Sequence, residues 1–88
     1  MKTIVASVGR GGLNRTEDVL LVQELLNRHI QAPQQPLVVD GVMSSRTITA
    51  IEAFQRRVVN IHRPDGRIDP GDRTMAALAR QVEQAPIV

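Results

Sequence analysis

The sequence predicts an all-α fold: a compact three-helix domain made of two related helix/Asp-Gly-turn/helix units, with short extended pieces in its loops. Three observations lead to this prediction. Three stretches of the 88-residue chain carry apolar residues at helical spacing. Two Asp-Gly pairs, which favour turns, separate these stretches. The order Gln, Asp-Gly, Thr occurs twice, so the two units would share the central helix.

The first helix is predicted to begin at Asn14, a good N-cap, with Glu17 three residues later completing a capping box. Its core-facing residues follow the helical period: Val19, Val22, Leu25, Leu26 and Ile30. Leu20 and Leu21 widen the apolar surface beyond this stripe. The helix therefore either packs on two sides, which is common in a small domain, or presents Leu20 and Leu21 to a protein partner.

The second helix follows a loop that opens at Pro33 and Pro36 and turns at Asp40-Gly41. Ser44 or Ser45 is expected to cap this helix, which should extend to about residue 60. Its inward face consists of Thr47, Ala50, Ile51, Phe54 and Val58.

The third helix follows a type I turn predicted over residues 63–66. Asp69-Pro70 or Asp72 should start this helix, because Asp caps helices and Pro suits the first helical position. Ala85-Pro86 should end it. The apolar stripe consists of Met75, Leu78, Ala79 and Val82.

Length and composition limit the chain to one modest core without a deep catalytic cleft. A chain of this length buries only about 60–65% of the surface that its unfolded form exposes. Phe54 is the single aromatic residue, so the core must consist of Leu, Val, Ile, Met and Ala. The absence of Cys excludes disulfides and thiolate metal sites. We expect no cofactor.

The isoelectric point of about 10.4 does not indicate a strongly positive surface. The formal net charge is only +2, from 11 basic and 9 acidic residues. Most of the basic residues are Arg, and few groups are left to titrate at high pH. Because phosphate binding needs clustered positive charge, we expect no nucleic-acid partner.

The first residues do not resemble a secretory signal. The apolar run in Met1–Val8 is short and is broken at once by Gly9-Arg10-Gly11-Gly12. No stretch approaches the roughly 20 apolar residues of a transmembrane helix. We therefore expect no signal peptide and no membrane partner. The chain would be cytoplasmic as synthesised, and would act in the periplasm or cell envelope if a signal-independent route exports it.

Residues 1–12 are predicted to form an N-terminal arm and Gly-rich hinge, residues 13–84 the domain, and residues 85–88 a short tail. Within the domain, the two occurrences of the repeat are Val22-Gln23, Asp40-Gly41 and Thr47, then Phe54-Gln55, Asp65-Gly66 and Thr74.

This order resembles the peptidoglycan-binding-domain family, small three-helix modules appended to many cell-wall hydrolases. The family has an Asp-Gly-x-Phe-Gly-x-x-Thr turn, followed by an Ala-Val/Ile-x-x-Phe-Gln helix and a second Asp-Gly turn. The corresponding segments here are Asp40-Gly41-Val42-Met43-Ser44-Ser45-Arg46-Thr47 and Ala50-Ile51-Glu52-Ala53-Phe54-Gln55. The resemblance covers roughly residues 13–80, and Met43-Ser44 stands where the family has Phe-Gly. It implies a three-helix fold and binding of peptidoglycan or a muropeptide.

The candidate ligand-binding residues lie on the second helix and in the two Asp-Gly turns: Asp40, Arg46, Gln55, Arg56, Asp65 and Arg67. Arg suits the carboxylates of wall peptides, because its planar fork donates two hydrogen bonds. Each candidate also has a structural interpretation. An Asp before Gly usually closes its own turn, and Gln55 either bonds loop backbone or faces a groove. The arginines, Arg57 and Arg63 included, could be a solvated surface.

The sequence favours a binding module and not an enzyme. Asp40 and Asp65 each precede Gly, which makes turn formation more plausible than a paired acid and base. His29 and His62 are far apart and lack the spacing of a zinc site. No Gly-x-Ser-x-Gly motif is present. We therefore expect no catalytic residues and no metal.

A second function remains open, in which the chain is a protein–protein adaptor. The missing export signal and the apolar pair Leu20 and Leu21 motivate it. The partner would be a wall hydrolase, an effector or a secretion spike. In that role the chain would link a cargo to a phage-like or type VI secretion assembly.

Overall fold

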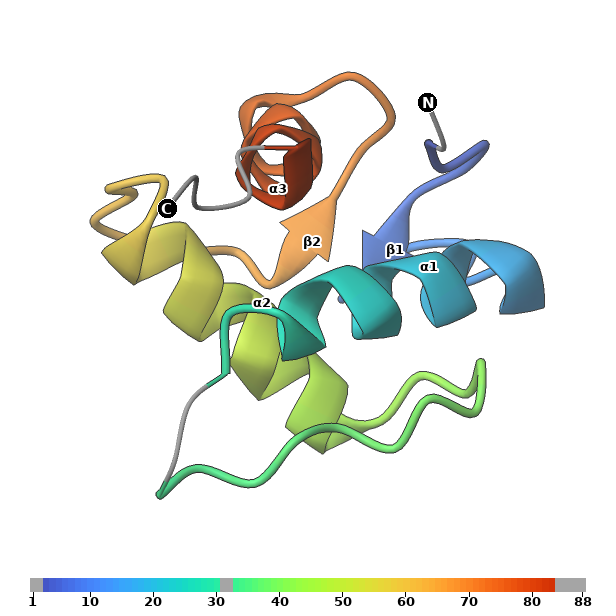
Figure 1. Ribbon diagram of the computed structural model, residues 1–88. Coiled ribbons are helices and arrows are strands. Elements are labelled where there is room, and N and C mark those ends of the chain that lie inside the picture. The colour runs from blue at the N-terminus through green and yellow to red at the C-terminus, as the bar shows by residue number, and fades with distance from the viewer. Residues whose placement is uncertain (1–2, 31–32, 84–88) are drawn as a thin grey trace.

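The computed structural model describes residues 3–30 and 33–83, and over residues 81–83 it describes the backbone alone (Figure 1). It contains three helices, α1 (Thr16–Asn27), α2 (Ser45–Arg57) and α3 (Arg73–Glu83). Two short strands, β1 (Val8–Gly9) and β2 (Arg67–Ile68), pair in an antiparallel sheet. The three predicted helices are therefore present, and the sheet is an addition to the all-α class.

The start of α1 differs from the prediction. Arg15 occupies the N-cap position and makes no side-chain capping bond. Asn14 is in the left-handed region, with φ of 57°. Its amide accepts a hydrogen bond from Gly9 N (2.7 Å) and donates to Gly9 O and Gly12 O (3.1 Å each). Asn14 is thus not the helix cap, because its side chain closes the preceding turn instead.

The starts of α2 and α3 agree with the sequence. The Ser44 hydroxyl accepts a hydrogen bond from Thr47 N at the start of α2. The Asp72 carboxylate accepts from Met75 N (2.8 Å) at the start of α3. The α2 helix ends at Arg57, slightly before the predicted boundary. The predicted stop of α3 at Ala85-Pro86 lies outside the described residues.

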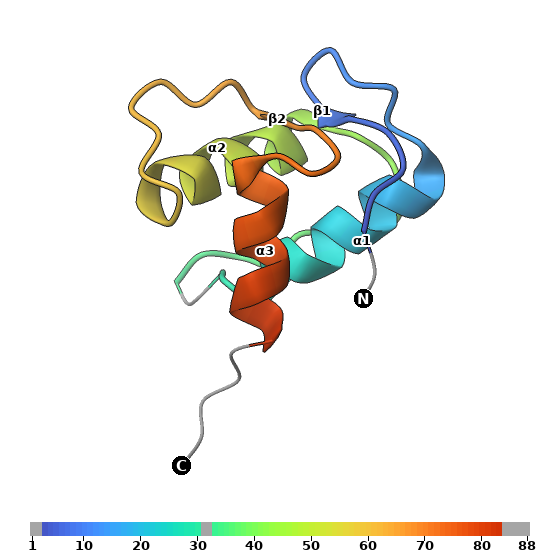
Figure 2. The same ribbon diagram turned by 90° about the horizontal axis from the view of Figure 1, so that it is seen from above.

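Figure 1 shows α3 end-on above the strands, while α1 and α2 cross below it; Figure 2 gives the view from above. The buried apolar core draws on every one of these elements. Its members include Ile4, Val8, Val19, Val22, Leu26, Leu37, Ile51, Phe54, Ile68, Met75 and Leu78. One cluster thus holds the described part of the chain together.

The N-terminal segment, predicted as an arm and hinge, contributes to this core. Ile4 and Val8 are buried, and Val8 pairs with Ile68 across the sheet. Gly9 has φ of +110°, and a Cβ there would lie only 2.1 Å from Gly66 O. Only glycine fits this contact. The pairing of β1 with β2 therefore joins the N-terminal segment to the segment that precedes α3.

Candidate functional site

The Gln23 side chain, 1% exposed on α1, organises the first Asp-Gly turn. Its Nε2 donates to Asp40 Oδ1 (3.2 Å), Val42 O (3.2 Å) and Thr47 Oγ1 (3.3 Å). Its Oε1 accepts from Asp40 N (3.1 Å) and Gly41 N (2.9 Å). We call this set of bonds the Gln23 network. Every polar atom of the amide is used to hold the turn onto α1 and α2.

The Gln55 side chain lies on α2, is also 1% exposed, and organises the second Asp-Gly turn. Its Nε2 donates to Asp65 Oδ1 (3.0 Å), Arg67 O (3.0 Å) and Thr74 Oγ1 (3.3 Å). Its Oε1 accepts from Gly66 N (3.0 Å). In this Gln55 network the amide bonds loop backbone and is buried. Of its two sequence interpretations the structure favours the loop-bonding one, because both polar atoms of the buried amide bond groups of the second turn and of the start of α3.

The two Asp side chains close their own turns. Asp40 Oδ1 accepts from Val42 N (3.0 Å), and Asp65 Oδ1 accepts from Arg67 N (3.1 Å). The hydrogen bond from Val42 N, followed by that from Gln23, lowers the pKa of Asp40 below its usual value. A carboxylate with a lowered pKa stays ionised, so it is poorly suited to act as a general acid.

Arg67 belongs to a polar cluster at the outer end of the sheet. Its Nε donates to Asp69 Oδ1 (2.8 Å), which also accepts from Ser7 Oγ (2.6 Å). These two bonds, with Ser7 the stronger influence, lower the pKa of Asp69. Arg56 is exposed on α2. Asp40 therefore lies in the first Asp-Gly turn, whereas Asp65 and Arg67 lie together in the second.

A groove of about 700 Å³ lies between the end of α1, the loop at residues 33–37 and the whole length of α2. Its apolar lining consists of Leu26, Ile30, Pro33, Leu37, Ala50, Ala53, Phe54 and Val58. Asn27 holds the loop in place, because its amide donates to Leu37 O (2.9 Å) and accepts from Leu37 N (2.7 Å). The volume lies within the range of about 300–1,000 Å³ usual for ligand sites.

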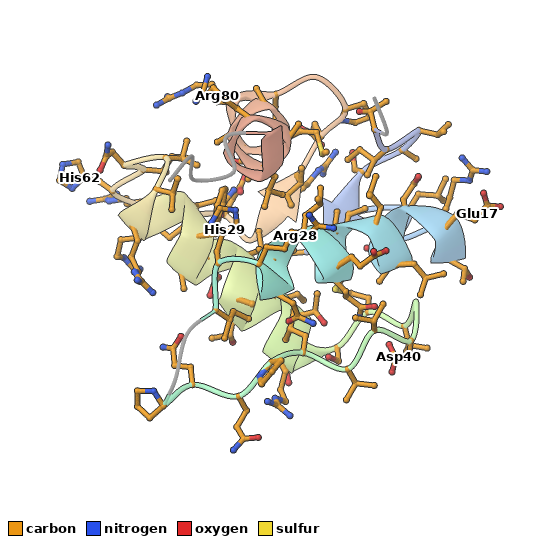
Figure 3. The ribbon with its side chains drawn as sticks, in the orientation of Figure 1. Glu17, Arg28, His29, Asp40, His62 and Arg80 are labelled. Atoms are coloured by element: carbon orange, nitrogen blue, oxygen red, sulfur yellow. The ribbon has the colours of Figure 1, made fainter. Side chains whose placement is uncertain are left out.

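Positive side chains line this groove. Arg28 comes from the C-cap of α1, and Arg46 and Arg57 come from the first and last turns of α2. None of the described residues that line it is Asp or Glu. Figure 3 places Arg28 by the end of α1 and Asp40 away from it, beside the start of that helix. Of the six ligand candidates, Arg46 alone lines the groove.

His29 also lines the groove and packs edge-on against Phe54, with ring centroids 4.9 Å apart. Its Nε2 is buried and has no hydrogen-bond partner within the described structure. Burial lowers the pKa of His29, because removal from water disfavours the charged ring. The neutral form of the His29 ring is therefore favoured at pH 7.

The predicted partner-contact residues Leu20 and Leu21 are half-buried on α1. Leu21 packs against the core. The side chain of Leu20 lies over the first turn, where its Cγ is 3.2 Å from the position of a Cβ on Gly41. More exposed apolar side chains lie in the following loop, with Val38 68% and Val42 61% exposed.

The described residues contain no group of three or more His, Asp or Glu side chains placed to hold a metal ion. Within the same residues no helix is long and apolar enough to cross a membrane. No protein-family model, curated protein or solved structure matches the chain. The groove is thus the feature on which a functional assignment can be based, and the sequence reasoning missed Arg28 and His29 as parts of it.

Proposed function

We propose that this chain is a non-catalytic module that binds bacterial cell-wall peptidoglycan in the groove between α1 and α2. The observation that carries the proposal is the composition of this groove: an apolar floor with Arg28, Arg46 and Arg57 around it, and no acidic side chain among the described residues that line it. Peptidoglycan offers matching chemistry, since its peptides combine methyl-bearing side chains with carboxylates. Arg binds carboxylates through two parallel hydrogen bonds.

The resemblance of the motifs to the peptidoglycan-binding-domain family supports the same proposal. In that interpretation the Gln23 and Gln55 networks are the two copies of one unit that share α2. Each network joins a Gln amide to an Asp carboxylate, a Thr hydroxyl and the backbone of a turn. The repeated residues then determine the fold, and the ligand binds elsewhere.

The use of both Asp side chains in turns also favours binding over catalysis. Asp40 and Asp65 are held by different helices and accept hydrogen bonds from their own turns. Cleavage of a glycosidic bond needs two carboxyl groups about 5–10 Å apart on either side of the substrate. We therefore assign these residues a structural role.

Co-sedimentation with purified peptidoglycan sacculi tests the proposed function. We expect the protein to pellet with sacculi at low salt and to be released as salt screens the arginines. An Arg46→Glu/Arg57→Glu double variant should remain in the supernatant. Circular dichroism of this variant should match the parent spectrum, because both side chains lie at the surface. If the parent protein does not pellet at low salt, the proposed function is wrong.

A protein adaptor is the second candidate function, and the exposed valines of the α1–α2 loop favour it. Val38, Val39 and Val42 lie on one exposed stretch, with Leu20 beside the turn that follows. An adaptor would use this surface to hold a wall hydrolase, an effector or a secretion spike. Purification of the tagged protein from its native host tests this, with a Val38→Ser/Val42→Ser variant as control. A partner retained equally by this variant would not support the adaptor surface.

A further inference from the structure

The face of α2 that lines the groove has an arginine at each end, and three of the four lining side chains between them are small. Arg46 lies in the first helical turn of α2, and Arg57 is the last residue of that helix. The residues between them that line the groove are Thr49, Ala50, Ala53 and Phe54. They recur at three- and four-residue spacing, which places them on one side of the helix together with both arginines.

This face has the dimensions of a short extended peptide. At the standard helical rise, Arg46 and Arg57 lie roughly 16 Å apart along the axis. An extended peptide advances about 3.3 Å per residue, so roughly five residues cover the same length. The small side chains of Ala50 and Ala53 leave room for a peptide backbone to approach the helix.

The groove is poorly suited to the sugar strand of peptidoglycan. Sugar rings pack their C–H faces on flat aromatic rings, whose faces carry partial negative charge. Phe54 is the single aromatic residue of the chain, and no Trp or Tyr is present. Phe54 is only 5% exposed, and the His29 ring packs edge-on with it. No exposed aromatic platform is therefore available for a sugar.

We propose that the groove holds the stem peptide of peptidoglycan, extended along α2, with one carboxylate at Arg46 and another at Arg57. This inference rests on the proposed function and names the part of the polymer that is recognised. Arg28 approaches the same groove from the α1 side. The alanines and Leu37 contact the methyl-bearing peptide side chains. The glycan strand remains outside in solvent.

Calorimetric titration of the full chain with three defined probes tests this inference. The first is a synthetic stem pentapeptide with free carboxylates, the second is the same peptide with carboxamides in their place, and the third is chitotetraose, a sugar chain without peptide. We expect the first to bind with a strength that falls as salt rises. The carboxamide peptide should bind at least about tenfold more weakly, because charge-assisted hydrogen bonds are lost. Chitotetraose should show no binding.

Substitutions on α2 locate the carboxylates. Arg46→Gln and Arg57→Gln should each weaken pentapeptide binding about tenfold, the loss expected for one charge-assisted contact. Arg56→Gln is the matched control, since Arg56 is exposed beside Arg57 on the same helix and does not line the groove. It should change the affinity less than about twofold. Equal losses in Arg56→Gln and Arg57→Gln would contradict the assigned position.

The outcomes separate this inference from the proposed function. If sacculi and chitotetraose bind while the pentapeptide does not, the module binds peptidoglycan through its glycan, and the stem-peptide assignment is overturned. If neither sacculi nor any probe binds, the proposed function fails as well. Binding of the pentapeptide that depends on Arg46 and Arg57 but not on Arg56 supports both.

Discussion

The Gln23 and Gln55 networks contain the same kinds of hydrogen bond, but the chain segments around them differ. Each buries one Gln amide, which bonds an Asp carboxylate, a Thr hydroxyl and turn backbone. The chain between Gln and Asp differs in length: Asp40 follows Gln23 by 17 residues, whereas Asp65 follows Gln55 by 10. The same hydrogen-bonding pattern therefore closes two turns that are connected to their Gln residues by segments of different length.

The longer connection creates the groove, and the shorter one is covered by the N-terminal segment. In the first half, Asn27 holds Leu37 so that the loop forms a wall opposite α2. In the second half, β1 pairs with β2, and Arg10 N donates to Gly66 O (2.9 Å). The Gln, Asp and Thr residues found in both networks hold the two turns onto the helices. The segments that differ decide which side of α2 borders the groove.

We expect the greatest loss of stability from a substitution where the N-terminal segment covers the second turn. Gly9→Ala would place a Cβ 2.1 Å from Gly66 O at a positive φ, so we expect a loss of more than about 3 kcal/mol in the free energy of unfolding. Urea denaturation followed by circular dichroism measures it. The control is Gly71→Ala, where φ is also positive but no atom lies within 4 Å; backbone strain alone should cost about 1–2 kcal/mol. Equal losses would mean that β1 does not pack tightly on the turn.

Substitution of Gln23 or Gln55 should cause the next largest loss of stability, and it compares the two networks directly. Gln23→Leu and Gln55→Leu each leave buried turn groups without partners, which should cost about 2–3 kcal/mol. Gln55→Leu should be the more damaging, because its turn also carries β2. Hydrogen exchange distinguishes the two variants at the Arg10 amide, which bonds Gly66 O. We expect this amide to lose protection in Gln55→Leu and to keep it in Gln23→Leu. The reverse pattern would mean that the two halves are not independently supported.

A smaller effect is expected for the groove wall. Asn27→Ala removes both hydrogen bonds to Leu37 and should cost about 1–2 kcal/mol of unfolding free energy. It should also weaken binding of the stem pentapeptide, since the loop no longer faces α2 at a fixed distance. Gln34→Ala, an exposed residue of the same loop, is the control for stability and should have almost no effect. Unchanged ligand affinity in Asn27→Ala would show that the wall does not contribute to binding.

The smallest effect is a pH dependence specific to the first half. Burial lowers the pKa of His29 in the folded state below the value of 6.5 that it has when unfolded. The unfolded chain therefore binds a proton more readily, and the free energy of unfolding should fall as pH decreases through 6.5 towards the folded pKa. Urea denaturation at several pH values measures this dependence. In a His29→Phe variant the free energy of unfolding should no longer fall over this pH range. If it still falls, another group is responsible.

The helices could be predicted because their signals are local. Apolar spacing locates all three, and Ser44 and Asp72 cap α2 and α3 as their side chains suggest. Asn14 has the same chemistry but a different role, since Asn both caps helices and tolerates positive φ. Its partners Gly9 and Gly12 determine which role it takes. The Asp-Gly turns were likewise recognisable, whereas the pairing of Val8 with Ile68 depends on the whole fold.

The candidate site was less accessible to sequence reasoning. Of the predicted ligand residues Arg46 lines the groove, whereas Gln55 and Asp65 bond each other in a turn and Arg67 bonds Asp69. The groove is formed by the end of α1, a loop and α2, and only the folded chain brings these together. The i, i+11 spacing of Arg46 and Arg57 on one helix face was a signal that sequence analysis could have used.

The pairing of β1 with β2 also has a consequence for protein synthesis. Translation proceeds from the N-terminus, so Val8 is made long before its partner Ile68. At about 5–20 residues per second, the interval is roughly 3–12 s. During that time the apolar N-terminal segment has no sheet to join. We expect the nascent chain to complete its core only after β2 has emerged, which makes attachment of the N-terminal segment a late step in folding on the ribosome.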